Sequence, residues 1–541
     1  MRKKLLFVAL LFGSVVSYAQ EASKVPTQET FDYNRCAISV ISMGGGAFTQ
    51  GIDSCEFMSG KFDINKIPCT QIGVVGNEIV GKKKQVLKEK AEEIRKELLA
   101  QNVGKQVLDY WLQYDGNVFN SSLLAKRTRY NKTDADVLNA NVDKVNTLNA
   151  ADKKLIGNSY VVVLSDNADG KSVDTYVFKA VLNDTVLTEV WNNWLDKDAS
   201  AANKSFYDNL KVDLEFVYAV NNAYESKDDN KATKLKGLFS KGNKEVSPDD
   251  IDPVATLNSA LDALERKIDK WQVTSTIFEV NPVAAKIGYK EGLRNSDRYR
   301  VFKVVEDENG NLEYKKVGFV RATEVFDNRT NAMGETDCSK FYKISGKTMK
   351  EGMFLKEKKD LKLSVSVSGV LGGYNYAQVD IDYLLKTKNT LGMMYFTGRS
   401  IGYHMGKKIV ETGSKTADEL LRPHYIPFSL NGAVAIHPIR ILEIMPNVGI
   451  GGDYCRLLGD TKSDNDNSYS KRIAYFAHGG VKVGLQVFYP IQLFVRADYS
   501  YKFSQGEWYI DTPNRFGKLS IGAGVKAVSY THLTLPTNRE V

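Results

Sequence analysis

Histidine is the usual general base beside a serine or cysteine nucleophile, and in this chain it occurs only late in the sequence. The first of the five histidines is His404, so the part of the chain before it has no histidine-based catalytic site. His404 and His424 lie close enough in sequence to Ser400 and Asp418 for a Ser/His or Asp/His pair. There is no HExxH zinc motif, no GxxxxGK[S/T] phosphate-binding loop and no EF-hand loop. We expect no enzymatic activity, no catalytic residue and no cofactor.

A more regular set of charged residues lies between residues 361 and 530. Its members alternate with apolar residues, so they share one face if the segments that carry them are extended. Charges of both signs occur, and a buried charge needs a partner of the opposite sign. We therefore expect eight residues to form a buried ionic cluster: Lys362, Asp380, Asp382, Glu443, Lys482, Arg496, Asp498 and Lys526.

The segments that carry these charges read as eight β-strands, each with one apolar and one polar face. Val481, Val483 and Leu485, for example, alternate with Lys482 and Gly484, and this period of two residues indicates a strand with two different faces. The links between strands alternate in length. Short links lie at 386–389, 437–440 and 489–492, and long polar links lie at roughly 405–424, 459–471 and 505–517.

Short turns on one rim and long loops on the other are typical of outer-membrane barrels. Residues 361–530 resemble the small OmpA/OmpX-type eight-stranded β-barrels of Gram-negative bacteria. The resemblance implies an antiparallel transmembrane barrel in outer-membrane lipid, with an interior only wide enough for side chains. The charged face then predicts an ionic plug, and a gated narrow channel remains the alternative.

The polarity of these strands has a second interpretation, because a soluble lipocalin-like barrel places its apolar residues inside. Alternation alone does not distinguish the two. The polar face carries glycines such as Gly449 and Gly480, which weaken a strand but leave room in a crowded interior. Aromatic residues such as Tyr489 and Tyr501 lie near strand ends, where the aromatic girdles of membrane proteins lie. Both features favour an apolar exterior.

The two ends of the chain carry different signals. Arg2-Lys3-Lys4, an apolar run and Ser17-Tyr18-Ala19 predict a secretory signal peptide over 1–19. Its removal lowers the formal net charge from +8 to +5, too little for this length to indicate nucleic-acid binding. Residues 531–541 break the alternation and contain Pro536, so we expect a non-native tail there.

Between the signal peptide and the barrel, helical and extended patterns are mixed. We expect 20–251 to be an α+β domain in the periplasm, with a strand at 36–43 and helices over 82–101 and 133–148. The runs 173–182 and 185–194 predict a hairpin around Asn183-Asp184. In 252–360 we expect a helix that starts at Pro253, whose apolar seam extends to Trp271, followed by a small SH3-like β module.

The five cysteines are too few and too scattered for a disulfide framework. Cys55 and Cys69 either pair in an oxidising periplasm or remain free thiols. No CxxC or Cys/His spacing indicates a metal site. The cysteines are Cys36, Cys55, Cys69, Cys338 and Cys455.

Together these features predict an exported, outer-membrane-anchored structural or interaction protein. The barrel is the anchor and the N-terminal region is a partner-binding module. Its partner would be an envelope protein or a cell-wall component. An even number of strands places both barrel ends on the short-turn rim, so the N-terminal region is expected in the periplasm. A small outer-membrane channel or transporter and a lipocalin-like ligand binder are the alternatives.

Overall fold

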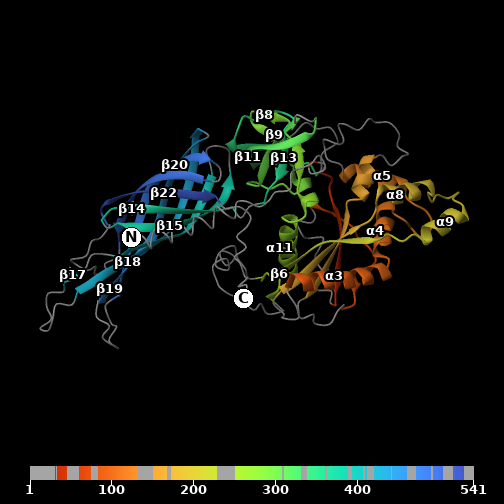
Figure 1. The fold of residues 1–541 in the computed structure, drawn as a ribbon, viewed down its shortest axis with the longest axis horizontal. Coiled ribbons are helices and arrows are strands. Elements are labelled where there is room, and N and C mark those ends of the chain that lie inside the picture. The colour runs from red at the N-terminus through yellow and green to blue at the C-terminus, as the bar shows by residue number, and fades with distance from the viewer. Residues whose placement is uncertain are drawn as a thin grey trace.

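The computed structural model shows an α/β region, a small β module and a C-terminal closed sheet (Figure 1). The signal peptide, the helix expected over 133–148, Cys55 and the tail 531–541 lie outside the residues it describes. No described helix is long and apolar enough to cross a lipid bilayer. The described residues are 31, 33–44, 60–74, 83–131, 150–166, 172–227, 250–306, 310–329, 338–359, 362–373, 375–387, 393–405, 409–410, 420–439, 441–459, 471–488, 491–503 and 516–528.

The first sheet has parallel and antiparallel halves. β1 pairs in parallel with β2, β3 and β4, and β4, β5 and β6 follow one another in antiparallel order. β1 is buried along its whole length because both faces of the sheet are covered, as in other parallel sheets. The strands are β1 (Ala37–Met43), β2 (Asp63–Ile64), β3 (Gln71–Ile72), β4 (Ser159–Asp166), β5 (Ser172–Ala180) and β6 (Leu214–Ala223).

Among the described residues, six helices cover one face of this sheet, and their apolar residues form one core cluster with its strands; α3, α4, α5, α8 and α9 can be followed in Figure 1. α3 confirms the helix expected over 82–101: Ala91, Ile94 and Leu98 point into the core and its charged residues face away. The helices are α3 (Lys83–Ala100), α4 (Val103–Leu112), α5 (Ser121–Asn131), α7 (Ala150–Ile156), α8 (Asp184–Asn192) and α9 (Ala201–Asp208).

The opposite face of the sheet is covered by α11 (Pro253–Glu265). Leu257, Leu261 and Leu264 pack there against residues such as Ile38 and Val162. The helix therefore does not belong with the β module in the expected unit 252–360. It is the third layer of the α/β region, because its apolar seam covers a sheet face that would otherwise be exposed.

The hairpin expected around Asn183-Asp184 was wrong in its second arm. β5 is a strand, but α8 replaces the strand expected over 185–194. The Asn183 side chain accepts a hydrogen bond from the Val186 amide at 2.9 Å, so it caps a helix and does not make a hairpin turn. Leu187 and Val190, one helical turn apart, then face the core.

The β module is a seven-stranded antiparallel sheet in the order β7-β13-β10-β11-β12-β9-β8. Tyr299, Val301, Phe341 and Leu355 are among the residues of its own core. The strands are β7 (Thr274–Thr276), β8 (Glu279–Val280), β9 (Val283–Ala285), β10 (Arg298–Glu306), β11 (Leu312–Glu324), β12 (Ser339–Gly346) and β13 (Phe354–Glu357).

The C-terminal sheet closes on itself and is called the barrel below. Its strands pair in the order β16-β15-β14-β22-β21-β20-β19-β18-β17, and an additional pairing of β16 with β18 joins the two sides. The strands are β14 (Leu363–Leu371), β15 (Tyr376–Thr387), β16 (Met393–Met405), β17 (Ile409–Val410), β18 (Leu420–Ile439), β19 (Leu442–Gly459), β20 (Lys471–Phe488), β21 (Ile491–Lys502) and β22 (Leu519–Val528).

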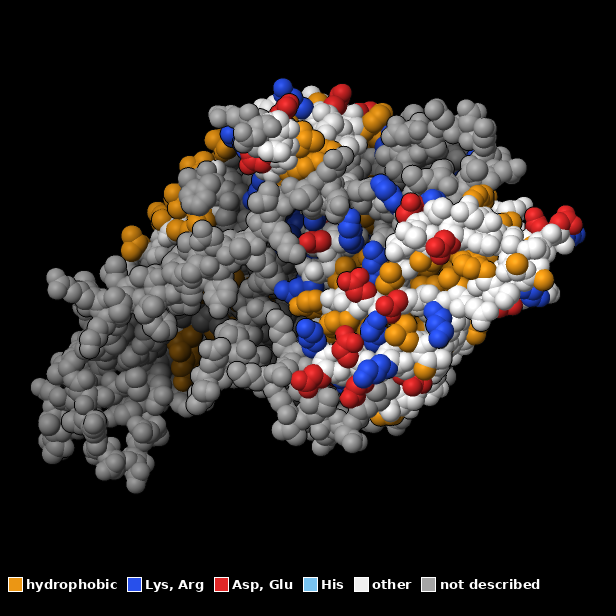
Figure 2. Space-filling model, turned by 45° about the vertical axis from the view of Figure 1, so that its right-hand side comes forward, with side chains coloured by type: hydrophobic (Ala, Val, Ile, Leu, Met, Phe, Trp, Pro, Cys, Tyr) orange, Lys and Arg blue, Asp and Glu red, His pale blue; other side chains and the backbone are white. Residues whose placement is uncertain are grey.

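The apolar face of the barrel strands points outward. Val448 is 69% exposed and Val495 is 55% exposed, whereas Arg496 is 7% exposed and Asp498 is 6% exposed. On the face seen in Figure 2, by contrast, the α/β region carries acidic and basic side chains side by side. This burial is the reverse of a lipocalin-like barrel, which keeps its apolar residues inside.

Candidate functional site

A chain of ion pairs runs through the barrel interior. Arg496 Nη1 lies 3.1 Å from Asp380 Oδ2, and Arg496 Nε donates a 2.5 Å hydrogen bond to Asp498 Oδ2. Lys482 Nζ lies 3.4 Å from Asp380 Oδ2 and 3.8 Å from Asp382 Oδ2. Arg496 and Lys482 therefore share one carboxylate, which satisfies buried charges of both signs.

The chain continues toward the rim with the short links. Lys526 Nζ lies 3.8 Å from Asp382 Oδ2 and 3.2 Å from Glu443 Oε1. These contacts bring together seven of the eight residues expected in the cluster, from Asp498 to Glu443, and none of the seven is more than 7% exposed. The interior is thus filled by paired side chains.

The expectation for Lys362 was wrong. Its Nζ lies 3.3 Å from the backbone oxygen of Asn295 and 3.9 Å from Asp297 Oδ1, both in the β module. Lys362 precedes the first residue of β14 and has a left-handed backbone with φ of 56°. The alternation of the strand therefore does not extend to it.

Several neutral or histidine partners of this cluster were missed. His437 Nε2 lies 3.3 Å from Glu443 Oε2, and Gln378 donates a 2.6 Å hydrogen bond to Asp380 Oδ1. The Ser366 hydroxyl lies 3.2 Å from Asp380 Oδ2. Gln378 is two residues from Asp380 on one strand, so period-two spacing could have placed it. His437 lies near the end of β18, two residues from the inward Ala435, so the same spacing could have placed it, but the sequence assigned it to a short link.

Glycines on the inward face make room for this cluster. A Cβ atom at Gly480 would clash with Asp498 Oδ1, and one at Gly522 would lie 3.1 Å from Arg496 Cγ. A small polar cavity beyond Arg496, lined by His478 and other residues, has room for little more than one water molecule. The interior therefore offers no space for an organic ligand there.

The segment with Ser400 and the two histidines is part of the barrel wall. Ser400 and His404 belong to β16, and His424 belongs to β18, where His404 pairs in register with Tyr425. Residues 398–402, Gly-Arg-Ser-Ile-Gly, have the spacing of a nucleophile elbow. That motif works in a sharp strand-to-helix turn, and here Ser400 lies within a strand. Asp418 lies outside the described residues.

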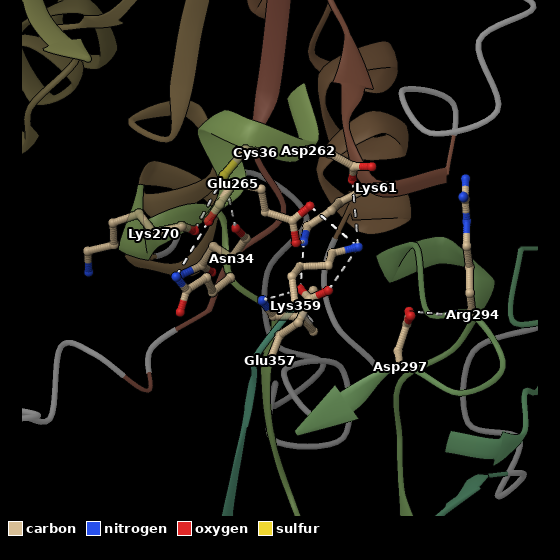
Figure 3. Close-up of polar contacts among 12 residues, drawn as sticks. Asn34, Cys36, Lys61, Asp262, Glu265, Lys270, Arg294, Asp297, Glu357 and Lys359 are labelled. Atoms are coloured by element: carbon tan, nitrogen blue, oxygen red, sulfur yellow. Dashed lines mark hydrogen bonds and ion pairs between the residues drawn. The ribbon is translucent and has the colours of Figure 1, made fainter. Parts of the chain in front are cut away.

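A second set of buried charges lies between the α/β region and the β module (Figure 3). Lys61 donates hydrogen bonds to Glu265, on α11, and to Glu357 Oε2 at 2.6 Å, on β13. Lys359 Nζ lies 3.6 Å from Glu265 Oε2 and 3.3 Å from Glu357 Oε1. These four residues are called the junction cluster. Nothing in the sequence distinguished them from ordinary surface charges.

The two carboxyl groups of the junction cluster differ in acidity. Burial, together with the nearby Glu357 carboxylate, raises the pKa of Glu265 to about 8. Burial acts on Glu357 too, but Lys61 and Lys359 hold the pKa of Glu357 well below its ordinary value. Against the effect of burial, the carboxylates of Glu265 and Glu357 raise the pKa of Lys359. The cluster is therefore held together by mutual charge compensation.

Cys36 and Cys69 are buried free thiols. Burial raises the pKa of Cys36 to about 12, which keeps the thiol protonated and unreactive. Cys69 is a free thiol 3.1 Å from Gln101 Oε1. Within the described ranges, no group of three or more His, Cys, Asp or Glu side chains is arranged to hold a metal ion.

Comparison with solved structures finds matches that cover 30% of this chain. The N-terminal β-barrel domain of OprF from Pseudomonas aeruginosa is 13% identical, with 95% of its length covered and a TM-score of 0.20. A major outer membrane protein from Thermus thermophilus is 12% identical, with 98% covered and a TM-score of 0.24. The attachment invasion locus protein Ail of Yersinia pestis is 10% identical, with 95% covered and a TM-score of 0.20. No protein-family profile and no curated protein matches the sequence.

Proposed function

We propose that this chain is an outer-membrane protein whose barrel is a lipid-embedded anchor of the small eight-stranded type. The observation that carries the proposal is the polarity of the barrel wall. Val448, Ile450 and Val495 are 55–69% exposed, while the charged residues of the same strands pair inside. An apolar exterior of this extent is unfavourable in water and favourable in lipid. The two-residue β17 pairs with the start of β18 on the same side as β16, and it is not counted among the eight.

The barrel is proposed to serve as an anchor and not as a channel. A continuous chain of ion pairs from Asp498 to Glu443 occupies the interior, and an interior of eight strands is only wide enough for side chains. The functional surface is then assigned to the α/β region. We propose that this region lies in the periplasm and binds an envelope protein or a cell-wall component.

The membrane assignment is tested by fractionation of cells that express the full chain. We expect the protein in the outer-membrane fraction, resistant to a carbonate wash, with a folded form that migrates differently from the boiled form in SDS gels. Recovery from the soluble periplasm without detergent would contradict the proposal.

The location of the α/β region is tested by protease treatment of intact cells. We expect residues 33–359 to be protected in intact cells and cleaved once the outer membrane is permeabilised. Cleavage in intact cells would place this region on the cell surface and would overturn the topology, while leaving the membrane anchor untouched.

A further inference from the structure

The β module lies against one end of the barrel (Figure 1), where β11 contacts β15. Tyr342, on β12, packs against a cluster of four buried apolar residues that point into the barrel: Leu384, Ala433, Ala435 and Met445. The centroids of the Tyr342 and His437 rings are 5.6 Å apart. A side chain of the soluble part thus completes an apolar layer within the barrel mouth.

A second contact holds the module at another point of the same rim. The Lys362 side chain, just before β14, reaches the Asn295 backbone oxygen at 3.3 Å and Asp297 at 3.9 Å. β11 also contacts β15. The module therefore touches the barrel just before β14, at β15 and at the end of β18. Contacts at separate strands fix its orientation over the mouth better than one flexible tether.

We propose that the β module is a cap that seals this mouth of the barrel, with Tyr342 as the residue that completes the seal. The apolar layer of Leu384, Ala433, Ala435 and Met445 offers no hydrogen-bond partner to water, and hydrophobic constrictions of this kind exclude water and ions. His437 links the cap to the interior, since it contacts Tyr342 on one side and Glu443 on the other. The barrel is closed twice, by the cap and by the ion pairs.

The inference extends the proposed anchor, on which it rests for the membrane setting alone. It adds that the β module, which carries the α/β region, packs directly on the barrel and is not connected to it by a flexible linker alone. A partner that binds the α/β region would then act on a body whose position relative to the membrane is set by the cap.

The test measures how fast a thiol within the apolar layer reacts with a water-soluble, charged methanethiosulfonate reagent. The full chain carries Ala435→Cys as its single cysteine, with the native cysteines replaced by serine. Ala435 is 0% exposed. A second chain with Val304→Cys, at a position 39% exposed on the β module, gives the rate for an accessible thiol.

Three substitutions are compared in the Ala435→Cys background. Tyr342→Ala removes the seal, and we expect the reaction to accelerate by about tenfold or more as the protected site opens. Tyr342→Phe keeps the apolar contact and should leave the rate slow. Tyr289→Ala removes a tyrosine of the same module that is 39% exposed, and it should also leave the rate slow.

Several results would contradict the proposal that the β module is a cap. These are equal rates in Tyr342→Ala and the parent, equal acceleration by Tyr289→Ala, acceleration by Tyr342→Phe, or a parent thiol as reactive as Val304→Cys. Thermal melting of each variant shows that the soluble part stays folded. The assay works in detergent micelles and in liposomes, so failure of the cap and failure to insert into liposomes are separate outcomes.

Discussion

Two regions of this molecule bury charged side chains, and they do so by different routes. In the barrel, the ion pairs join alternate residues of strands that face one another across the interior: Lys482 on β20 and Arg496 on β21 both lie beside Asp380 on β15. In the junction cluster, Lys61 meets Glu265 and Glu357 across sequence separations of 204 and 296 residues. Both obey the rule that buried charge needs a partner. Only the barrel charges follow a local pattern in the sequence, the alternation of polar and apolar residues along each strand.

Among the substitutions considered, a change at Lys61 is expected to have the largest effect on stability. Lys61→Met leaves two buried carboxyl groups with one remaining lysine, and above about pH 8, where Glu265 is ionised, we expect it to lower the free energy of unfolding by about 3–5 kcal/mol. The matched control is Lys340→Met. Lys340 Nζ lies 2.8 Å from Glu324 Oε2, and both side chains are exposed to solvent. Exposed pairs of this kind contribute about 0–1 kcal/mol. Denaturant unfolding of the full protein in detergent, followed by tryptophan fluorescence, measures both.

A paired replacement separates charge compensation from packing at the same site. Lys61→Met with Glu265→Gln leaves Lys359 beside Glu357 at 3.3 Å, so the remaining buried charges are balanced even above about pH 8, where Glu265 would otherwise ionise. We expect the double variant to be more stable than Lys61→Met alone when both are measured above that pH. A double variant no more stable than the single one would show that the cluster is not held by charge compensation.

The sequence predicted one of these regions far better than the other, for a physical reason. Alternation assigns every second residue of a strand to one face, so the strand pattern predicted the inward charges. It did not extend to Lys362, whose backbone leaves the strand conformation. Lys61, Glu265 and Glu357 lie in unrelated elements, and only tertiary packing buries them. No spacing in the sequence could have predicted that these three residues meet.

Gly480 tests the barrel side of the comparison. Gly480→Ala places a Cβ atom in a clash with Asp498 Oδ1 and 2.6 Å from the Ala497 backbone oxygen. Overpacking of this kind costs about 1–3 kcal/mol, so we expect the barrel to unfold at lower temperature in the gel assay. Val481→Leu, one residue away on the exposed face, should change this temperature little. Equal effects of the two substitutions would argue against a crowded interior.

The junction cluster also predicts a dependence of stability on pH. Burial and Glu357 raise the pKa of Glu265 from 4.5 to about 8. Between these values the folded protein holds a proton that the unfolded chain releases. The free energy of unfolding therefore falls as the pH rises through this window, by up to about 1.4 kcal/mol per pH unit. The stability that the protonated Glu265 contributes is fully present below pH 4.5 and is lost as the pH rises to about 8.

Glu265→Gln removes this titration while keeping the shape of the side chain. We expect the unfolding free energy of the variant to fall less steeply than that of the parent between about pH 4.5 and 8, measured by denaturant titration at several pH values. Parallel curves for parent and variant across this window would show that Glu265 is ionised in the folded protein.

The smallest expected effect concerns the one element that the sequence pattern assigned to the wrong class. Asn183→Ala removes the cap of α8 and should lower the free energy of unfolding by about 1 kcal/mol. Asn193→Ala, at the other end of the helix, is the control, because its side chain donates to the Glu189 carbonyl at an exposed position. If Asn183→Ala is neutral, the helix does not depend on this cap.

The central claim, that the apolar face of the barrel meets lipid, is tested most directly by nitroxide spin labels on protein reconstituted in bilayers. Val495 and Ile521, on the barrel wall, are 55% and 54% exposed, and Leu312, on the β module, is 54% exposed. We expect labels at Val495 and Ile521 to collide with dissolved oxygen and to be shielded from a water-soluble nickel complex, and a label at Leu312 to show the opposite. Equal access of the nickel complex to all three labels would contradict a lipid-facing barrel.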